Sequence, residues 1–311
     1  MIGVFPLIAA RSYGALGLSV LCFKTPYDMM HTGAVDCLTQ PGREDVIEVF
    51  VDYLSRIPRT WPIIRIREIP ENSPSMICLN RRSAHLHAIQ RRCGGENYIQ
   101  IPGSIENFHA SLSSNFRRQL KRGRKKLEEL EDVRILCREE LRPLEENMRR
   151  FEEVEDAGWK GAENSSIKAD EKNSRFYAIA AKRFKNHGWM EWNFLETNNK
   201  SIGAHYAVRI KRTLFLLKIG YDEKYSAFSP GNLLLEQIVE NACLSGDVDE
   251  INCVAECAWH KNWAMKNRLL YELIILPRIP VISAMISSIL NSATFHKILE
   301  RFGKKLIPAI T

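Results

Sequence analysis

The chain has 311 residues, of which 45% are hydrophobic and 26% are charged, and this is the composition of a globular protein. Such a length suffices for two domains of ordinary size or one large domain, and no segment approaches the ~20 consecutive apolar residues that span a bilayer. The formal net charge of +7 favours anionic partners, whether nucleic acid, a membrane face or a phosphorylated cofactor.

The cysteines and the N-terminal stretch bear on location. The eight cysteines are scattered and form no CxxC pair, so we interpret them as reduced thiols in a cytoplasmic protein. The apolar start of the chain has no basic n-region and is interrupted by Arg11, which favours strands over a signal peptide. Cys253, Cys257 and His260 lack the spacing of a closed tetrahedral site, so no metal is predicted.

The first hundred residues alternate between strand-like and helix-like patterns. Apolar residues recur with helical spacing over 43–57, whereas isoleucines alternate with charged residues over 62–69. Asn72-Ser73-Pro74 favours the start of another helix. The expected order is strand 2–10, strand 16–23, helix 43–57, strand 62–69, helix 71–92 and strand 96–102.

The rest of the chain opens with a helix and contains three strands in a row. Ser104 is expected to cap a helix over 104–130, and Gly188 to end another. Asn198-Asn199 and Lys211-Arg212 are hairpin-like connectors, so the fold class is α+β rather than a doubly wound sheet. The expected order continues with helix 104–130, strand 133–139, helices 141–159 and 166–188, strands 189–196, 201–210 and 213–222, a helix after Ser229-Pro230-Gly231, strand 249–256, short helix 259–267, strand 269–276 and an amphipathic helical tail over 277–311.

Ser229-Pro230-Gly231 connects the third of these strands to a helix. Ser229 can cap that helix, Pro230 suits its first turn, and Gly231 leaves the backbone open. The free N–H groups at a helix start attract phosphate, especially where a small residue allows close approach. By itself the tripeptide is more typical of an ordinary helix start than of an anion site.

Five segments carry a family resemblance. In this order they resemble the CelD-type, cellulose-biosynthesis-associated acetyltransferases, a GNAT group with distant similarity to Fem-type aminoacyltransferases. The resemblance extends over residues 30–275. The segments are LSSNFRRQLKRGRKKLEE at 112–129, GWKG at 158–161, RFYAIAAKRFKNHGWMEWNFLE at 175–196, IGAHYAVRIKRTLFLLKIGYDEKYSAFSPGNLL at 202–234 and HKNW at 260–263.

The resemblance implies two GNAT-like halves with mixed, largely antiparallel sheets flanked by helices. The N-terminal half, 1–102, would be incomplete, because the group carries another strand and helices ahead of the segment matching Ile2–Ala10. The second half, 103–276, would hold an acyl-CoA, most simply acetyl-CoA, as co-substrate, and 277–311 would follow as the tail. The glycine-rich phosphate loop Arg/Gln-x-x-Gly-x-Gly/Ala of typical GNAT proteins is absent, and Ser229-Pro230-Gly231 stands in its place. The cofactor-binding residues implied are Ile219, Gly220, Ser229, Pro230, Gly231, Asn232 and Leu233.

Acyl transfer to an amine needs a deprotonated amine, a stabilised oxyanion and a proton for the leaving thiolate. Tyr221 is the candidate acid and Asp222 the group that orients or deprotonates the amine. Lys261 would stabilise negative charge, as a lysine in a similar region does in the Fem-type relatives. Tyr221 could equally be a tyrosine that only packs at the strand end, and Asp222 an ordinary turn aspartate. The candidate substrate-binding residues are Trp159, Lys160, Glu196, His205 and Tyr206, of which either His205 or Tyr206 faces the cleft because neighbours on a strand alternate.

Residues 117–126 contain seven positive charges and no acidic residue. The simplest interpretation is a solvated helix face, and the functional ones are a phosphate-rich acceptor, the 3′-phosphate of CoA, or RNA. Only Phe116 flanks the run, so the aromatic residues that single-strand binding prefers are nearly missing. The tail over 277–311 either caps the sheet or contacts a membrane surface, since basic residues follow its apolar stripe.

The sequence therefore predicts an N-acyltransferase, most simply an acetyltransferase, that acts by direct attack, because no nucleophile and base show a recognisable spacing. The acceptor would be a small-molecule, glycan or peptide amine, with polysaccharide or cell-envelope metabolism as the implied context in a bacterial cytoplasm. A Fem-type transferase that uses aminoacyl-tRNA is the rival enzyme, and a catalytically inactive GNAT-fold scaffold is the rival without chemistry.

Overall fold

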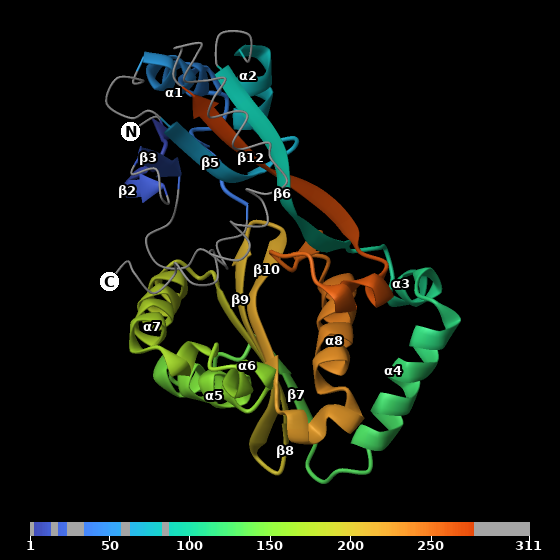
Figure 1. Cartoon of the computed structure of the whole chain (residues 1–311). Helices are drawn as coiled ribbons and strands as arrows, with labels where there is room; N and C mark the ends of the chain where they lie inside the picture. Colours follow the sequence, from blue (N-terminus) through green and yellow to red (C-terminus); the bar gives the residue numbers. More distant parts are fainter. Residues whose placement is uncertain (1–2, 14–17, 24–33, 57–62, 83–86, 277–311) are drawn as a thin grey trace, which may run out of the picture. The chain divides into compact units, whose positions relative to one another are not determined.

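The structure, a computed structural model, describes residues 3–13, 18–23, 34–56, 63–82 and 87–276 of the chain. It is an α+β fold of mixed sheet and flanking helices, as expected (Figure 1). Two compact units share the chain, one containing Ala34–Gly94 with the segment from Leu269, the other Gly95–Arg268. The boundaries expected at 102 and 276 differ from these, because the strand at 269–276 pairs within the first unit. The tail expected over 277–311 lies outside the described residues.

The first unit packs two helices on one face of a small sheet. Isoleucines of β5 and apolar residues of α1 and α2 form one buried cluster, which explains the helical and alternating patterns read from the sequence. Strand β3 runs parallel to β5, and β12 runs antiparallel to it. The elements are β1 (Gly3–Val4), β2 (Ile8–Tyr13), β3 (Leu18–Phe23), β4 (Leu38–Thr39), α1 (Asp45–Arg56), β5 (Ile63–Pro70), α2 (Pro74–Arg82), the first part of β6 (His87–Gln100) and most of β12 (Lys266–Leu276).

The second unit is built on strands in the order β6-β11-β10-β9-β8-β7. All neighbours are antiparallel except β10 and β11, which run parallel. The hairpin between β8 and β9 turns at Asn198 and Asn199, both with positive φ, as the two-residue turn requires. The strands are β7 (Arg134–Cys137), β8 (Met190–Thr197), β9 (Lys200–Ile210), β10 (Thr213–Tyr221) and β11 (Glu250–Asn252).

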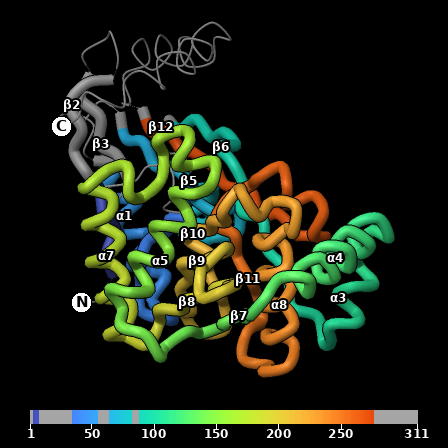
Figure 2. The backbone as a smooth tube through the Cα atoms, turned by 90° about the horizontal axis from the view of Figure 1, so that it is seen from below, coloured from blue at the N-terminus to red at the C-terminus, as the bar shows by residue number. Residues whose placement is uncertain are grey.

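Helices cover both faces of this sheet. On one face, α5 and α7 bury Phe151 and Tyr177 against Trp192 and Tyr206, and on the other α8 and α4 pack with residues such as Leu214 and Leu216. Figure 2 shows the same two groups from below. The helices are α3 (Ile105–Ser111), α4 (Ser114–Leu127), α5 (Leu144–Asp156), α6 (Trp159–Ala162), α7 (Glu171–Asn186) and α8 (Pro230–Ser245), with short 3-10 helices at Ile167–Ala169, Glu223–Phe228 (η4) and Ala258–Trp263.

Two helices expected from the sequence are wrong in extent. The helix expected over 71–92 ends at Arg82, and residues 87–100 form β6 instead, because pairing with distant strands stabilises a segment with weak helical spacing. The helix expected over 104–130 is divided between α3 and α4. Leu112 and Ser113 are extended there, and the Ser113 hydroxyl accepts a hydrogen bond from the Phe116 amide at 3.2 Å, so a second cap starts a new helix.

Candidate active site

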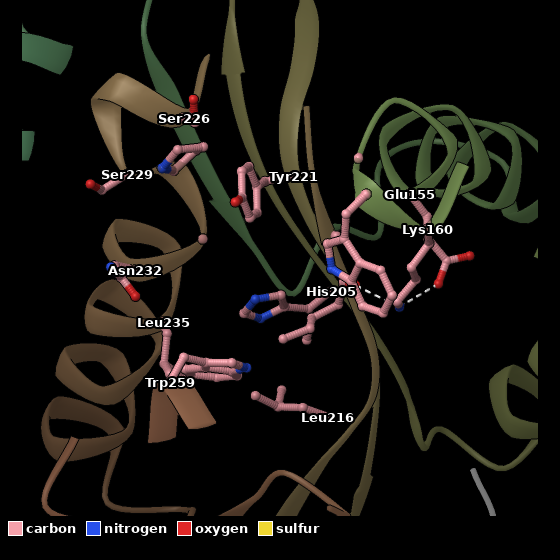
Figure 3. Close-up of a pocket in the computed structure, with 16 residues that line it drawn as sticks. Glu155, Lys160, His205, Leu216, Tyr221, Ser226, Ser229, Asn232, Leu235 and Trp259 are labelled. Carbon is pink, nitrogen blue, oxygen red and sulfur yellow. Dashed lines mark hydrogen bonds and ion pairs between the residues drawn. The ribbon is translucent and has the colours of Figure 1, made fainter. Parts of the chain in front are cut away.

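A cavity of about 320 Å³ opens between β10 and α8 in the second unit. Its lining comes from six parts of the chain: the end of α5 with α6, His205 of β9, the outer half of β10, Ser226 of η4, the start of α8, and Trp259. Figure 3 shows His205 at the centre, with Tyr221 and Trp259 on either side of it. The sequence-predicted residues that line the cavity are Trp159, Lys160, His205, Ile219, Gly220, Tyr221, Ser229, Pro230, Gly231 and Asn232.

Strand β10 has a free edge at this cavity. It pairs with β11 only from Thr213 to Phe215, whereas its pairing with β9 continues to Tyr221. A bulge between Leu216 and Lys218 marks the point where β10 leaves its parallel neighbour. Beyond the bulge, the backbone groups of β10 that point away from β9 therefore have no strand beside them at the cavity, and an exposed strand edge is a template for pairing with an extended ligand.

The start of α8 forms the opposite wall. Ser229 has a left-handed backbone, with φ of 54°, and its hydroxyl makes no cap hydrogen bond, so the side-chain cap expected from the sequence is not formed. Pro230 has no N–H, and no side chain caps the amides that follow it in the first turn of α8. A Cβ at Gly231 would lie 3.5 Å from Cδ1 of Tyr221, an ordinary contact, so the backbone is open to a ligand there.

Lys160 reaches the free edge of β10 from the other side of the sheet. Its Nζ donates to the carbonyl oxygen of Ile219 at 3.0 Å and to Oε1 of Glu155 at 2.6 Å (Figure 3). The Glu155 side chain is only 1% exposed, and its Oε2 accepts from the Ile167 amide at 2.8 Å. An ammonium has three N–H donors, so one donor of Lys160 remains for a ligand.

Close packing fixes this arrangement. A Cβ at Gly220 would come within 2.9 Å of Cα of Glu155, and one at Gly158 within 2.8 Å of the Tyr221 carbonyl oxygen. These two glycines let the end of α5 lie directly on β10, and this brings Lys160 to the cavity.

His205 and Tyr206 point to opposite faces of β9. His205 lines the cavity and is 2% exposed, and burial lowers its pKa to about 3. The ring is therefore neutral near pH 7, and its Nδ1 has no hydrogen-bond partner among the described residues. Tyr206 lies in the core, where its hydroxyl donates to the Tyr177 carbonyl oxygen at 3.0 Å.

The two neighbours at the end of β10 differ in environment. Tyr221 lines the cavity, and burial together with the nearby Glu223 raises the pKa of its phenol, so it is protonated near neutral pH. Asp222 is 2% exposed, and its Oδ2 accepts from Lys200 at 2.7 Å while Oδ1 accepts from the Lys224 amide at 3.0 Å. Burial alone would raise the pKa of Asp222, but these hydrogen bonds outweigh it and hold the pKa below its usual range. Asp222 thus caps η4 and does not line the cavity.

The remaining candidate residues lie elsewhere. Lys261 is exposed and does not line the cavity, although its neighbour Trp259 does. Leu233 is buried in the core between α8 and α4. Glu196 is 0% exposed and pairs with Arg150, with Arg142 3.7 Å away, so it is a buried structural charge rather than a group facing the cavity.

A Glu196→Gln variant is expected to lower the free energy of unfolding by roughly 3 kcal/mol, because it leaves the buried Arg150 guanidinium without its counter-charge. Chemical denaturation measures this change. If Glu196 acted as a base, the variant would instead lose activity at unchanged stability.

Sequence reasoning missed several lining residues, including Glu155, Ser226 and Trp259. Glu155 had a detectable signal. It continues the apolar stripe of α5 formed by Met148 and Phe151, and an acidic residue in such a stripe is buried and needs a partner. Trp259 follows a short strand and has no comparable pattern around it.

Neither a metal cluster nor a membrane span is found in the part of the chain that the structure describes. No three His, Cys, Asp or Glu side chains gather there as metal ligands would. Among the same residues, no helix has both the length and the hydropathy to cross a bilayer.

Comparison with known proteins supports the fold. Residues 114–258 match the family model described as an acetyltransferase (GNAT) domain, and this segment contains almost all of the cavity lining. No curated protein matches the chain significantly.

Solved structures give a wider likeness. The crystal structure of FemX has a TM-score of 0.61 at 8% identity and covers 90% of this chain and 86% of that chain. The C-terminal domain of a putative lysylphosphatidylglycerol synthetase from Agrobacterium fabrum has a TM-score of 0.55 at 9% identity, covering 92% and 84%. A conserved protein of unknown function from Bacteroides thetaiotaomicron has a TM-score of 0.53 at 9% identity, covering 88% and 84%. At such identities the likeness shows a shared fold alone.

Proposed function

We propose that this protein transfers an acyl group, most simply acetyl from acetyl-CoA, to an amine by direct attack. The observation that carries the proposal is the single cavity shared by the free edge of β10, the open start of α8 and the ammonium of Lys160. The match of residues 114–258 to an acetyltransferase domain supports the same chemistry.

The cavity suits an acyl-CoA. The free edge of β10 offers backbone donors and acceptors to the amides of the pantetheine arm, and the first turn of α8 offers N–H groups to the pyrophosphate. Gly231 lets a bulky phosphate approach without a clash. His205 adds a second, independent sign of a ligand, because its buried Nδ1 has no partner among the described residues.

Three side chains have separate roles in the proposed reaction. The amine nitrogen attacks the thioester carbon, and the carbonyl oxygen becomes an oxyanion that the remaining donor of Lys160 stabilises. The carbon–sulfur bond then breaks, the amine nitrogen loses its proton to water, and the protonated Tyr221 gives a proton to the thiolate. Neutral His205 can donate or accept a hydrogen bond and so orients the bound groups.

Direct attack fits the surroundings of the hydroxyl groups in the cavity. Ser226 and Ser229 line it, but among the described residues neither hydroxyl is hydrogen-bonded to a histidine or carboxylate that could activate it. No acyl-enzyme intermediate is therefore proposed.

The rate should rise with pH as the acceptor amine loses its proton, with no step between pH 5 and 7.5. Because the folded pKa of His205 is lowered to about 3, its ring stays neutral throughout that window and contributes no titration. A pH profile of kcat/KM for the acceptor measures this. A limb near pH 6.5 that disappears in a His205→Asn variant would contradict the assignment.

The acceptor and its context rest on the family resemblance. Trp159 is 53% exposed beside the cavity, and we propose that it contacts a glycan or peptide amine. Membership of the CelD-type group and a role in polysaccharide or envelope metabolism are proposed on the same basis. So are a cytoplasmic location and membrane contact through the tail, which lies outside the described residues.

Aminoacyl transfer from tRNA is the second candidate, and the exposed basic face of α4 favours it. One assay separates the two: free thiol release from acetyl-CoA on adding a panel of amines, run beside aminoacyl release from charged tRNA. The proposal expects thiol release with at least one amine. Aminoacyl release without any thiol release would overturn the acyl-CoA proposal in favour of the second candidate. If neither product is released, the protein is an inactive scaffold.

A further inference from the structure

The basic helix α4 touches the segment that leads into α8. A Cβ at Gly123 would lie 3.2 Å from the Phe228 carbonyl oxygen and 3.5 Å from Cβ of Ser229. Nζ of Lys126 lies 3.5 Å from the carbonyl oxygen of Ala227. Figures 1 and 2 both show α4 alongside α8. The C-terminal half of α4 is therefore next to the helix start proposed for the pyrophosphate.

Most of the basic side chains of α4 form no ion pair within the described part of the protein. Arg124 pairs with Glu236 at 2.7 Å, and Arg117 donates to the His109 carbonyl oxygen. Lys126 likewise reaches only a backbone carbonyl oxygen, that of Ala227. No ion pair or hydrogen bond to a described residue is made by the side chains of Arg118, Lys121, Arg122 and Lys125, so these four are available to a ligand.

The helix dipole accounts for only part of this charge. Basic residues in the last turn, such as Lys125 and Lys126, compensate the negative C-terminal end of α4. Arg122 lies before that turn and gains little from the dipole. It precedes Lys126 by four residues, so the two side chains lie on one side of α4, the side that reaches Ala227.

We propose that Arg122 and Lys126 bind the 3′-phosphate of the acyl donor, an inference that rests on the proposed function. With the pyrophosphate at the first turn of α8, the ribose and its phosphate lie outside the cavity, where α4 meets residues 226–229. These two cations then supply the positive charge that the Ser229-Pro230-Gly231 turn itself lacks.

A small anion fits this face better than RNA does. The aromatic residue that flanks the run of cations, Phe116, is 2% exposed and packs against Trp263, so it cannot stack on a base. The exposed face thus offers cations without a stacking platform, and single-stranded nucleic acid binds best where both are present.

The test compares acetyl-CoA with 3′-dephospho-acetyl-CoA by calorimetry. Wild type should bind acetyl-CoA about tenfold more tightly, as charge-assisted hydrogen bonds to a dianion allow. An Arg122→Gln/Lys126→Gln variant should reduce the preference to about twofold or less. The matched control is Lys121→Gln/Lys125→Gln, on the side of α4 that lines a groove with Glu236, and it should keep the preference. All four side chains are exposed, and thermal unfolding should confirm that both variants fold.

The outcomes separate this inference from the proposed function. Equal binding of the two donors by wild type, or a preference that survives in Arg122→Gln/Lys126→Gln, overturns the phosphate site while leaving the transferase intact. No binding of either donor overturns both. Binding of tRNA that the same variant abolishes, without a change in donor preference, assigns the cations to RNA and also overturns the inference.

Discussion

A Lys160→Met variant is expected to lose about 10²- to 10³-fold in kcat, with little change in the KM for acetyl-CoA. Among the described residues that line the cavity, Lys160 alone carries a positive charge at neutral pH, because His205 is neutral. Its unused donor acts only once the carbonyl oxygen becomes negative, so its loss weakens the transition state more than the bound substrate. Steady-state kinetics with a responsive amine measures both constants.

Two further variants keep this result interpretable. Lys160→Met leaves the buried Glu155 without its cation and should destabilise the fold, whereas Lys160→Met/Glu155→Gln should regain stability without regaining kcat. Lys261→Met is the matched control and should stay close to wild type, since Lys261 is exposed outside the cavity. Full kcat in a folded Lys160→Met variant, or an equal loss in Lys261→Met, would contradict the role of Lys160.

A Gly231→Glu variant is expected to weaken acetyl-CoA binding by at least about 100-fold. The added side chain enters the space beside Tyr221 and places a negative charge where the pyrophosphate would lie. A carboxylate in the first turn of a helix favours the helix itself, so the fold should persist. Thermal unfolding with and without acetyl-CoA measures the effect, because a donor at 100 times its Kd stabilises the wild type by about 2.7 kcal/mol.

A Gly231→Ala variant is the control that distinguishes the effect of the charge and size of the glutamate from the effect of merely replacing the glycine. The new Cβ would make an ordinary contact at 3.5 Å, so this variant should fold and should retain most of the stabilisation by acetyl-CoA. A Gly231→Glu variant that is stabilised as much as Gly231→Ala would place the donor elsewhere.

The strand, loop and helix around Ser229 were predictable because they are local. Alternation identified β9 and β10, and the turn residues marked the hairpins and the start of α8. The end of a strand and the start of the helix that follows it lie close together when the connecting loop is short, and therefore Ile219, Tyr221 and Gly231 line one cavity. The left-handed backbone of Ser229 was not predictable, since serine usually starts a helix by capping it with an extended backbone.

Contacts between distant segments account for the rest. Glu155 and Lys160 reach β10 only because Gly158 and Gly220 allow two backbones to approach, and no spacing in the sequence reveals that pair. The first part of β6, up to residue 92, was misread as helix for a similar reason, since its conformation depends on strands far along the chain. Lys261 was assigned to the site by family resemblance alone. In the structure Trp259 lines the cavity, whereas Lys261, two residues further along the chain, does not.

Hydrogen–deuterium exchange with and without acetyl-CoA tests most directly whether the donor lies along β10 with its phosphates at α8. The amides of residues 216–221 and 231–234 should exchange more slowly when acetyl-CoA is bound, because a paired strand edge and a phosphate would cover them. Slower exchange confined to other parts of the chain, with these two segments unchanged by bound acetyl-CoA, would contradict the placement.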